Sequence, residues 1–292
     1  MGPRLQMKYF RILLHQHLKK SLFFGLALLT YCHAPARAYV LPGPYLLKLM
    51  TQNLGKGKRL LVTQKLVLLN DNPQKNSLEL SETLKYVFPK KFRSDILSEN
   101  IQRIHVLSKG RSLTVIDGKT SDEAESRYDY YKDLLLFRSR EMLQERLSHL
   151  GVDPKVSSLG RFQEKPVYVL GAQYPDETVP QVWLDKNTFR PLRWIIASQT
   201  QQRLEVRYLQ WHKLKNTWYP MHIEFFADGN LVREIHVENI KVNPSFPKNL
   251  FDIEHLKSRY PQAESTVPED QDKKESLNEI EKTIENFKKI YK

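Results

Sequence analysis

Apolar residues along this chain follow two different periods. Residues 44–54 have helical spacing and are followed by Gly55, so we expect one short amphipathic helix there. Helical spacing returns between Tyr130 and Leu150, with charged residues opposite the apolar stripe, and this predicts a single second helix closed by Gly151. Other segments alternate as β-strands do, and these cover residues 60–69, 78–88, 101–116 and 165–253.

The strand segments favour an antiparallel meander. Within 165–253 they recur at intervals of roughly 10 residues and are joined by short polar turns. Asp117-Gly118 and Asp228-Gly229 are dipeptides typical of tight turns. Parallel strands need long crossover connections, for which this spacing leaves no room. We therefore expect an α+β fold that consists mainly of antiparallel β-structure.

The amino terminus has the order of a cleavable signal peptide. A basic region ending at Lys19-Lys20 precedes the apolar run 21–30, and Ala36-Arg37-Ala38 supplies a small-residue cleavage site. A membrane-spanning helix needs about 20 apolar residues, so a membrane anchor is the weaker interpretation. A lipid anchor at Cys32 is not expected, because the bulky Tyr31 precedes it. We expect export to the periplasm, with cleavage after Ala38.

Loss of this segment changes the charge and the chemistry of the chain. The first 38 residues hold six of the 46 basic residues and none of the 33 acidic ones, which leaves 40 against 33 and lowers the formal charge from +13 to +7. The single cysteine, Cys32, leaves as well, so disulfides and thiol chemistry are not expected. Basic and aromatic residues interleave at 203–208, but acidic residues lie among them, and we expect no nucleic-acid partner.

The remaining chain divides into one domain and a tail. Residues 39–256 are long enough for one sizeable core. Residues 257–274 are polar and charged, which is typical of a linker. Residues 275–292 predict an amphipathic helix whose apolar seam runs from Leu277 to Tyr291. Two heptads are too short for a stable free coiled coil. This helix therefore packs back on the domain or frays, which is the favoured interpretation, or it docks to a membrane-protein partner or a membrane surface.

The sequence lacks the common signatures of catalysis. It contains no Gly-x-Ser-x-Gly, no His-Glu-x-x-His, no P-loop and no dinucleotide-binding glycine motif. A hydrolase would need a nucleophile with a base in reach or paired carboxylates in a cleft. We therefore expect a protein that is not an enzyme and that needs no cofactor.

One group of polar residues offers ligands for a metal ion. A three-residue loop at 228–230 would place His222 opposite His236 and Glu224 opposite Glu234, with the apolar neighbours on the other face. Glu238 lies on the same run, and two imidazoles with two carboxylates are able to hold a divalent metal. A two-residue turn would instead pair Glu224 with Arg233 and separate the group. An ordinary solvated sheet face is the favoured interpretation, so no metal site is predicted.

Four segments, read in order, resemble the periplasmic lipoprotein-carrier and lipoprotein-sorting superfamily. Each motif is weak alone, but their order, the position of the helical section and the signal peptide strengthen the resemblance, which covers residues 45–252. The segments are Leu84–Arg93 with its Pro-x-x-Phe-Arg, Val115–Thr120 with its Asp-Gly-Lys turn, the hairpin Val182–Arg193, and Ile240–Asp252 with its closing Leu-Phe-Asp.

The resemblance implies an incomplete, half-closed β-barrel covered by helices, which encloses an apolar cavity for acyl chains. Burial of acyl chains gains about 0.8 kcal/mol per CH₂ group. The expected function is non-catalytic binding of lipoprotein or lipid acyl chains, for transport or sorting towards the outer membrane. The candidate cavity residues are Leu66, Leu68, Leu84, Tyr86, Phe88, Leu113, Val115, Val169, Trp183, Trp194, Ile196, Tyr208, Phe225 and Ile235.

One position departs from the pattern of the superfamily. Its carriers have an arginine immediately before the proline of the first motif, and that arginine holds the lid closed by hydrogen bonds. Phe88 occupies this position here, and Arg93 is a different position. Carrier-type gating is therefore in question. An alternative is an envelope regulatory or interaction protein of the same fold that docks a membrane-protein partner.

Overall fold

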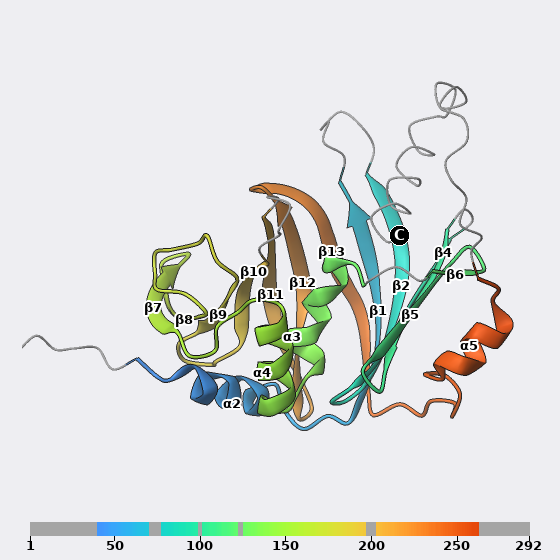
Figure 1. Cartoon of the computed structure of the whole chain (residues 1–292), viewed down its shortest axis with the longest axis horizontal. Coiled ribbons are helices and arrows are strands. Elements are labelled where there is room, and N and C mark those ends of the chain that lie inside the picture. The colour runs from blue at the N-terminus through green and yellow to red at the C-terminus, as the bar shows by residue number, and fades with distance from the viewer. Residues whose placement is uncertain (1–39, 70–76, 99–100, 122–124, 197–202, 263–292) are drawn as a thin grey trace, which may run out of the picture. The chain divides into compact units, whose positions relative to one another are not determined.

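The computed structural model describes residues 40–69, 77–98, 101–121, 125–196 and 203–262 (Figure 1). The predicted signal peptide, the predicted C-terminal helix and most of the predicted linker lie outside these residues. None of the helices formed by the described residues is both long enough and apolar enough to cross a bilayer.

Thirteen antiparallel strands form one curved sheet in the described part of the chain (Figure 1). Their order is β6-β5-β4-β3-β2-β1-β13-β12-β11-β10-β9-β8-β7, so β6 and β7 form the two edges and the sheet is not closed into a barrel. This confirms the predicted fold class. The strands are β1 (Arg59–Leu68), β2 (Leu78–Val87), β3 (Lys91–Leu97), β4 (Gln102–Ser108), β5 (Arg111–Ile116), β6 (Lys119–Ser121), β7 (Ser157–Phe162), β8 (Lys165–Leu170), β9 (Gln181–Asp185), β10 (Pro191–Ile196), β11 (Leu204–Leu214), β12 (Thr217–Ala227) and β13 (Asn230–Val242).

The connection between β6 and β7 carries the helices that pack on the sheet. It contains the 3₁₀ helix η1 (Arg127–Lys132) and the α-helices α3 (Asp133–Leu136) and α4 (Arg140–His149), which together we call the helical cover. The prediction of a single helix over 130–150 is wrong, because Phe137 leaves the helical conformation with ψ of 88°. The chain bends at this point, and the side chain of Arg138 donates hydrogen bonds to the Gly55 oxygen and to Thr217 Oγ1.

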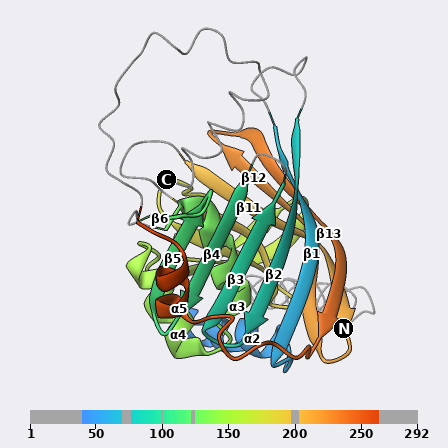
Figure 2. The ribbon, with the colours of Figure 1, turned by 90° about the vertical axis from the view of Figure 1, so that its right-hand side faces the viewer.

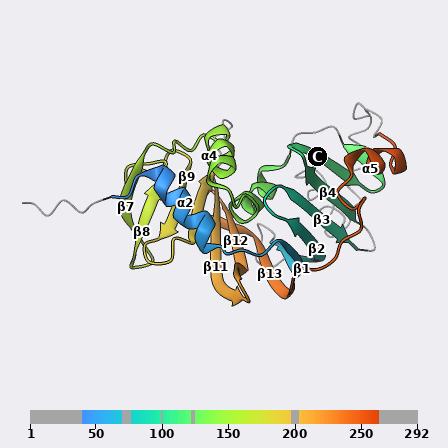
Figure 3. The same ribbon diagram turned by 90° about the horizontal axis from the view of Figure 1, so that it is seen from below.

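The predicted N-terminal helix is confirmed as α2 (Gly43–Asn53). Seen from below, α2 runs across the lower end of the sheet beside α4 (Figure 3). Its first residue lies against the carbonyl of Pro154, and the residue that follows its end, Gly55, forms a bridge with Thr217. A Cβ atom at Gly55 would come within 2.1 Å of the Asn216 oxygen, so only glycine permits this close approach.

The two faces of the sheet are covered by different helices. The face that packs against the helical cover is called the inner face, and its side chains form the main core of the protein. On the opposite, outer face, α5 (Ile253–Arg259) covers β4 and β5, as the side view shows (Figure 2). Residues 257–262, assigned to a linker from the sequence, form the last turn of α5 and a bridge from Gln262 to Thr120.

The β12–β13 hairpin has the predicted register but not the predicted loop. His222 lies opposite His236 and Glu224 opposite Glu234. The turn has two residues rather than three, namely Asp228 and Gly229, which both have positive φ. The register shifts after Phe225, where Val232 is the additional residue on β13. This bulge restores the pairing that a two-residue turn would otherwise have displaced.

Candidate functional site

The inner face and the helical cover form the candidate ligand-binding site. Leucines at 134, 135, 136, 143 and 147 of the cover are at most 1% exposed and belong to the same core cluster as the inner face of the sheet. Their burial in this shared cluster places them between the cover and the sheet. The site is therefore a helix-on-sheet interface that is closed in this structure.

Most of the predicted cavity residues meet at this interface. Nine are buried in the main core, and Phe88 is half-buried against it. The other four lie on the outer face, because side chains alternate along each strand. Leu113 and Val115 pack beneath α5, whereas Val169 and Trp183 form a small cluster of their own. The nine buried residues are Leu66, Leu68, Leu84, Tyr86, Trp194, Ile196, Tyr208, Phe225 and Ile235. Their role as the lining of a lipid cavity stays a prediction.

Side chains occupy the space between the sheet and the helical cover. Trp194 and Tyr208 are fully buried there, and Tyr208 donates a hydrogen bond to the backbone oxygen of Tyr131 in η1 at 2.9 Å. An acyl chain would therefore have to displace the cover rather than enter an existing void. A polar pocket of about 170 Å³ lies elsewhere, at the start of α5, and its lining includes Lys91, Lys109, Arg111 and Lys248.

Trp194 carries a polar atom that the apolar part of the interface does not satisfy. Its side chain is fully buried, and its Nε1 finds no hydrogen-bond acceptor among the described residues. Trp183, on the outer face, donates its own Nε1 hydrogen to Gln181 at 2.8 Å. A buried donor without an acceptor costs about 1–3 kcal/mol. The indole of Trp194 is thus a donor available to a ligand that carries an acceptor into the core.

The helical cover is held to β4 by buried charges. Glu125, just before η1, contacts the Lys132 ammonium, receives a hydrogen bond from Arg146 at 2.7 Å and lies 3.2 Å from His105 Nε2. Burial alone would raise the pKa of Glu125, but Lys132, His105 and Arg146 together hold it well below the ordinary value of 4.5. The carboxylate is therefore ionised, and it links three separate elements.

Asp133 completes this ionic group at the start of α3. Its side chain is fully buried, receives a hydrogen bond from Arg146 Nε at 2.7 Å and lies 3.3 Å from the Lys132 ammonium. Burial raises the pKa of Asp133, and the nearby Glu125 adds to the rise, against the pull of Lys132 and Arg146. Burial lowers the pKa of Lys132, but the carboxylates of Asp133 and Glu125 raise it above its ordinary value.

A third buried carboxylate lies on the sheet itself. Glu82 on β2 accepts hydrogen bonds from Gln64 at 2.6 Å and from Ser94. Burial raises its pKa above 4.5 despite these bonds and the nearby Arg103. Arg103 in turn pairs with Asp129 of η1 at 2.6 Å. The inner face of β2–β5 is therefore polar at its centre, whereas that of β8–β12 is mainly apolar. On β13 the inner face carries the buried Arg233, whose guanidinium lies 4.2 Å from the ring centroid of Tyr128 in η1.

Arg138 fastens the bend of the helical cover to the body of the sheet. Its guanidinium lies 3.6 Å from the ring centroid of Phe88 and donates to the Gly55 oxygen at 3.3 Å and to Thr217 Oγ1 at 2.7 Å. Burial lowers the pKa of Arg138 to about 10, against the opposing effects of Tyr86 and Tyr219. Phe88 is the residue that departs from the superfamily pattern, which has an arginine at this position. Here the ring of Phe88 instead contacts an arginine of the bend, Arg138.

The ionic part of this site was not predicted from the sequence. In β4, Arg103 and His105 alternate with apolar residues, and such alternation indicates a solvated face. Both residues are at most 1% exposed because η1 and the segment before it cover them. A usable signal was present in the cover, where Glu125, Asp129 and Lys132 recur at helical spacing with both signs of charge.

An open antiparallel sheet whose inner face is covered by helices is the architecture of lipoprotein-sorting proteins, and this chain has that fold. A domain from Vibrio parahaemolyticus named for outer membrane lipoprotein sorting aligns with 74% of this chain and 98% of its own length, at 14% identity and a TM-score of 0.53. A DUF1329 family protein from Desulfovibrio piger aligns with 73% of this chain and 97% of its own, at 13% identity and a TM-score of 0.51.

A LolA superfamily protein from Nitrosomonas europaea covers 74% of this chain and 99% of its own length, at 11% identity and a TM-score of 0.48. At these identities the likeness establishes the fold alone. The sequence matches no protein-family model and no curated protein.

Proposed function

We propose that this protein is exported to the periplasm and binds the acyl chains of lipids or lipoproteins, without catalysis, between its inner face and its helical cover. The observation that carries the proposal is an apolar sheet face covered by short helices that are held by side-chain contacts at their ends. Such a cover can separate from the sheet without breaking any strand pairing.

The free energies of apolar burial favour replacement of the cover by acyl chains. Full exposure of five leucines of the cover would cost about 1.5–3 kcal/mol each, or roughly 8–15 kcal/mol in all. Two chains of about 15 methylene groups, at about 0.8 kcal/mol for each group, gain roughly 24 kcal/mol on burial. Two acyl chains therefore offset the displacement of the cover, whereas one chain only balances it. The proposed cargo accordingly has at least two chains.

Trp194 supplies a polar anchor in the same place. An acyl ester or amide carries a carbonyl oxygen into apolar surroundings, and the buried Nε1 of Trp194 is a donor for it. The hydrogen bond would satisfy an atom that has no acceptor among the described residues. This supports a lipid with ester or amide groups over a plain hydrocarbon.

The test compares two tryptophans. The protein should take up a fluorescent diacyl probe, and Trp194→Phe should weaken this uptake because the carbonyl loses its donor. Trp183→Phe is the matched control, because that tryptophan lies on the outer face and is equally buried. Mass spectrometry of gently purified protein should also detect copurified lipid. Absence of copurified lipid together with absence of probe uptake would defeat the proposal.

A second candidate function rests on the filled interface. Because side chains already occupy the inner face, the same fold also suits a scaffold that docks a membrane-protein partner, with the predicted helix 275–292 as the docking element. In that case a pulldown recovers one inner-membrane protein, and deletion of residues 263–292 abolishes the recovery. Recovery that is unchanged by the deletion, together with uptake of the diacyl probe, would favour the lipid carrier.

A further inference from the structure

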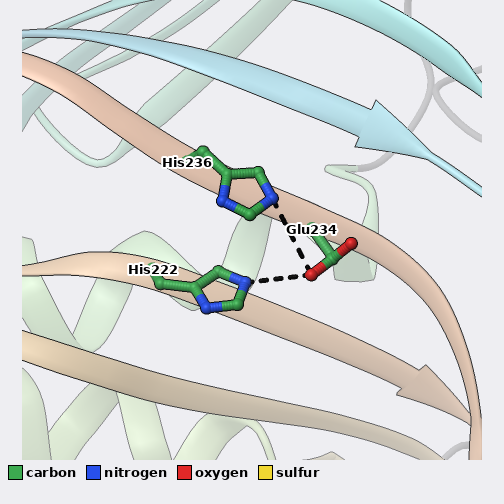
Figure 4. A group of neighbouring side chains, drawn as sticks. All are labelled: His222, Glu234 and His236. Carbon is green, nitrogen blue, oxygen red and sulfur yellow. Dashed lines mark hydrogen bonds and ion pairs between the residues drawn. The ribbon is translucent and has the colours of Figure 1, made fainter.

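The outer face of the β12–β13 hairpin brings two imidazoles and a carboxylate together (Figure 4). His222 lies directly opposite His236, and their rings stack with centroids 4.5 Å apart and planes 18° apart. Glu234 lies two residues before His236 on β13. Its Oε1 atom is 3.0 Å from Nε2 of His222 and 3.7 Å from Nε2 of His236. Both rings thus direct the same nitrogen at one carboxylate oxygen.

We propose that His222, Glu234 and His236 bind a divalent transition-metal ion, with zinc as the best fit. Two imidazole nitrogens and one carboxylate oxygen form a donor set that zinc uses with a fourth position left for water or another ligand. Calcium and magnesium prefer oxygen ligands, so this set selects against them. The site lies apart from the proposed lipid interface and does not depend on it.

The spacing of the three donor atoms suits a tetrahedral ion. Zinc lies about 2.0–2.1 Å from its ligands, which places tetrahedral ligands about 3.3 Å from one another. The two distances from the carboxylate oxygen, 3.0 and 3.7 Å, lie on either side of this value. All three donor atoms are within 4.8 Å of one another. Side-chain rotation therefore suffices to close the site, and the paired strands fix the backbone.

The charges around the site also suit a cation. Lys65 of β1 is the strand neighbour of His236, but its ammonium pairs with Glu79 at 3.4 Å. Glu224 lies opposite Glu234 and adds a second carboxylate to this part of the face. Arg207, the neighbour of Glu224 on β11, donates to Glu205 at 2.6 Å. The nearest basic side chains thus have carboxylate partners of their own.

Solvent reaches all three side chains. His222 and Glu234 are 14% and 22% exposed, and His236 is 47% exposed. An ion can therefore enter without any change in the fold, and the fourth ligand can come from solvent or from another molecule. A bound ion would link β12 to β13 on the face turned away from the helical cover. Zinc would thereby stabilise the hairpin and leave the inner face unchanged.

The experiment titrates zinc into the purified protein, without a histidine tag, by isothermal calorimetry. We expect saturable binding of one ion, a rise in the unfolding temperature with zinc, and no response to magnesium. His236→Gln and Glu234→Gln should each weaken binding by about 100-fold or more, beyond the 10–100-fold typical of outer-shell changes.

The matched control is His212→Gln, which removes an exposed histidine of β11 that lies outside the group. This variant should bind zinc as the unchanged protein does. Cobalt supplies an independent readout, since its visible absorption reports a tetrahedral site and should disappear in His236→Gln. The proposal is overturned by the absence of saturable zinc binding, or by zinc affinity that His212→Gln lowers as much as His236→Gln does.

Discussion

The helical cover meets two halves of the inner face through different chemistry. Over β8–β12 its leucines belong to one core cluster with Trp194, Tyr208 and other apolar side chains. Over β2–β5 it is joined to the sheet by carboxylates, a lysine and arginines that are almost entirely withdrawn from water. Apolar contacts are non-directional and can be exchanged for other apolar groups. Buried ion pairs fix one geometry, and they are costly when one partner is lost.

This difference assigns separate tasks to the two ends of the interface. In the proposed function the ionic half determines where the cover lies, whereas the apolar half is the part where an acyl chain would replace a leucine. Arg138, at the bend between α3 and α4, is the boundary between the two. The following four substitutions test this division, beginning with the largest expected effect.

Glu125→Gln should destabilise the protein by about 3–5 kcal/mol. The substitution leaves Asp133 as the one carboxylate that Lys132 and Arg146 still share. One positive charge of the buried group then lacks a compensating negative charge, and an uncompensated buried charge carries this cost. Urea unfolding at pH 7 measures the change. Because the pKa of Glu125 is lower in the folded state than in the unfolded state, its stabilisation is present above pH 4.5 and is lost as the pH falls through the lowered pKa.

The control for Glu125→Gln is Glu254→Gln. Glu254 pairs with Arg111 at 2.9 Å, but both side chains are more than 60% exposed. Exposed pairs contribute about 0–1 kcal/mol, so this variant should unfold almost as the unchanged protein does. Equal losses in the two variants would show that the buried group does not position the cover.

Arg138→Leu should destabilise the protein by about 2 kcal/mol, since hydrogen bonds to a charged group contribute about 1.5–3 kcal/mol. It should also speed hydrogen exchange in α3 and α4, because the bend loses its bonds to Gly55 and Thr217. Arg140→Leu, two residues along on the exposed surface, is the control. Exchange that accelerates equally in the two variants would contradict the role given to Arg138.

Glu82→Gln should stabilise the protein at pH 7 by about 1 kcal/mol. Burial raises the pKa of Glu82, so its contribution favours folding at low pH and is lost as the pH rises through the raised value. Glutamine still accepts a hydrogen bond from Ser94 and avoids a buried charge. Urea unfolding between pH 4 and 8 should show a gain that grows with pH. A gain that is constant across this range would contradict the assignment.

Trp194→Phe should change the stability of the ligand-free protein by less than about 1 kcal/mol, because the loss of ring area is offset by removal of an unsatisfied donor. Trp183→Phe should cost more, since it breaks the hydrogen bond to Gln181. Thermal unfolding compares the two variants. A larger loss at Trp194 than at Trp183 would indicate that its Nε1 has an acceptor in the folded protein.

The fold was largely predictable from the sequence. Strand alternation and turn dipeptides depend on local chemistry, and they predicted the antiparallel sheet and the Asp117-Gly118 turn. Helical spacing of apolar residues predicted α2. The break in the helical cover was not predictable in this way. Residues up to Phe137 keep a helical stripe, but the bonds that Arg138 makes to Gly55 and Thr217 end the helix, and those partners are distant in sequence.

The site was predictable only in its apolar part. Leu66, Tyr86 and Phe225 lie on the inner face, whereas Leu113 and Trp183 lie on the outer one, because periodicity defines two faces of a strand without telling which face meets the helices. The ionic group around Glu125 and Asp133 was not predicted, because charged residues are almost never buried unless they are paired. The pairing of Arg103 with Asp129 depends on how η1 lies over β4.

The pairing of β1 with β13 has a consequence for how the protein folds. Among the described residues these strands are the first and the last in sequence, yet they lie side by side near the middle of the sheet. Strands β1–β6 and β7–β13 can each pair locally as they emerge, but the seam between them needs residues about 180 positions apart. The sheet therefore becomes continuous only after the chain has emerged as far as the end of β13. A chain that threads across a membrane from its amino terminus would reach the far side as two unjoined halves, and the interface proposed to bind lipid would be completed there.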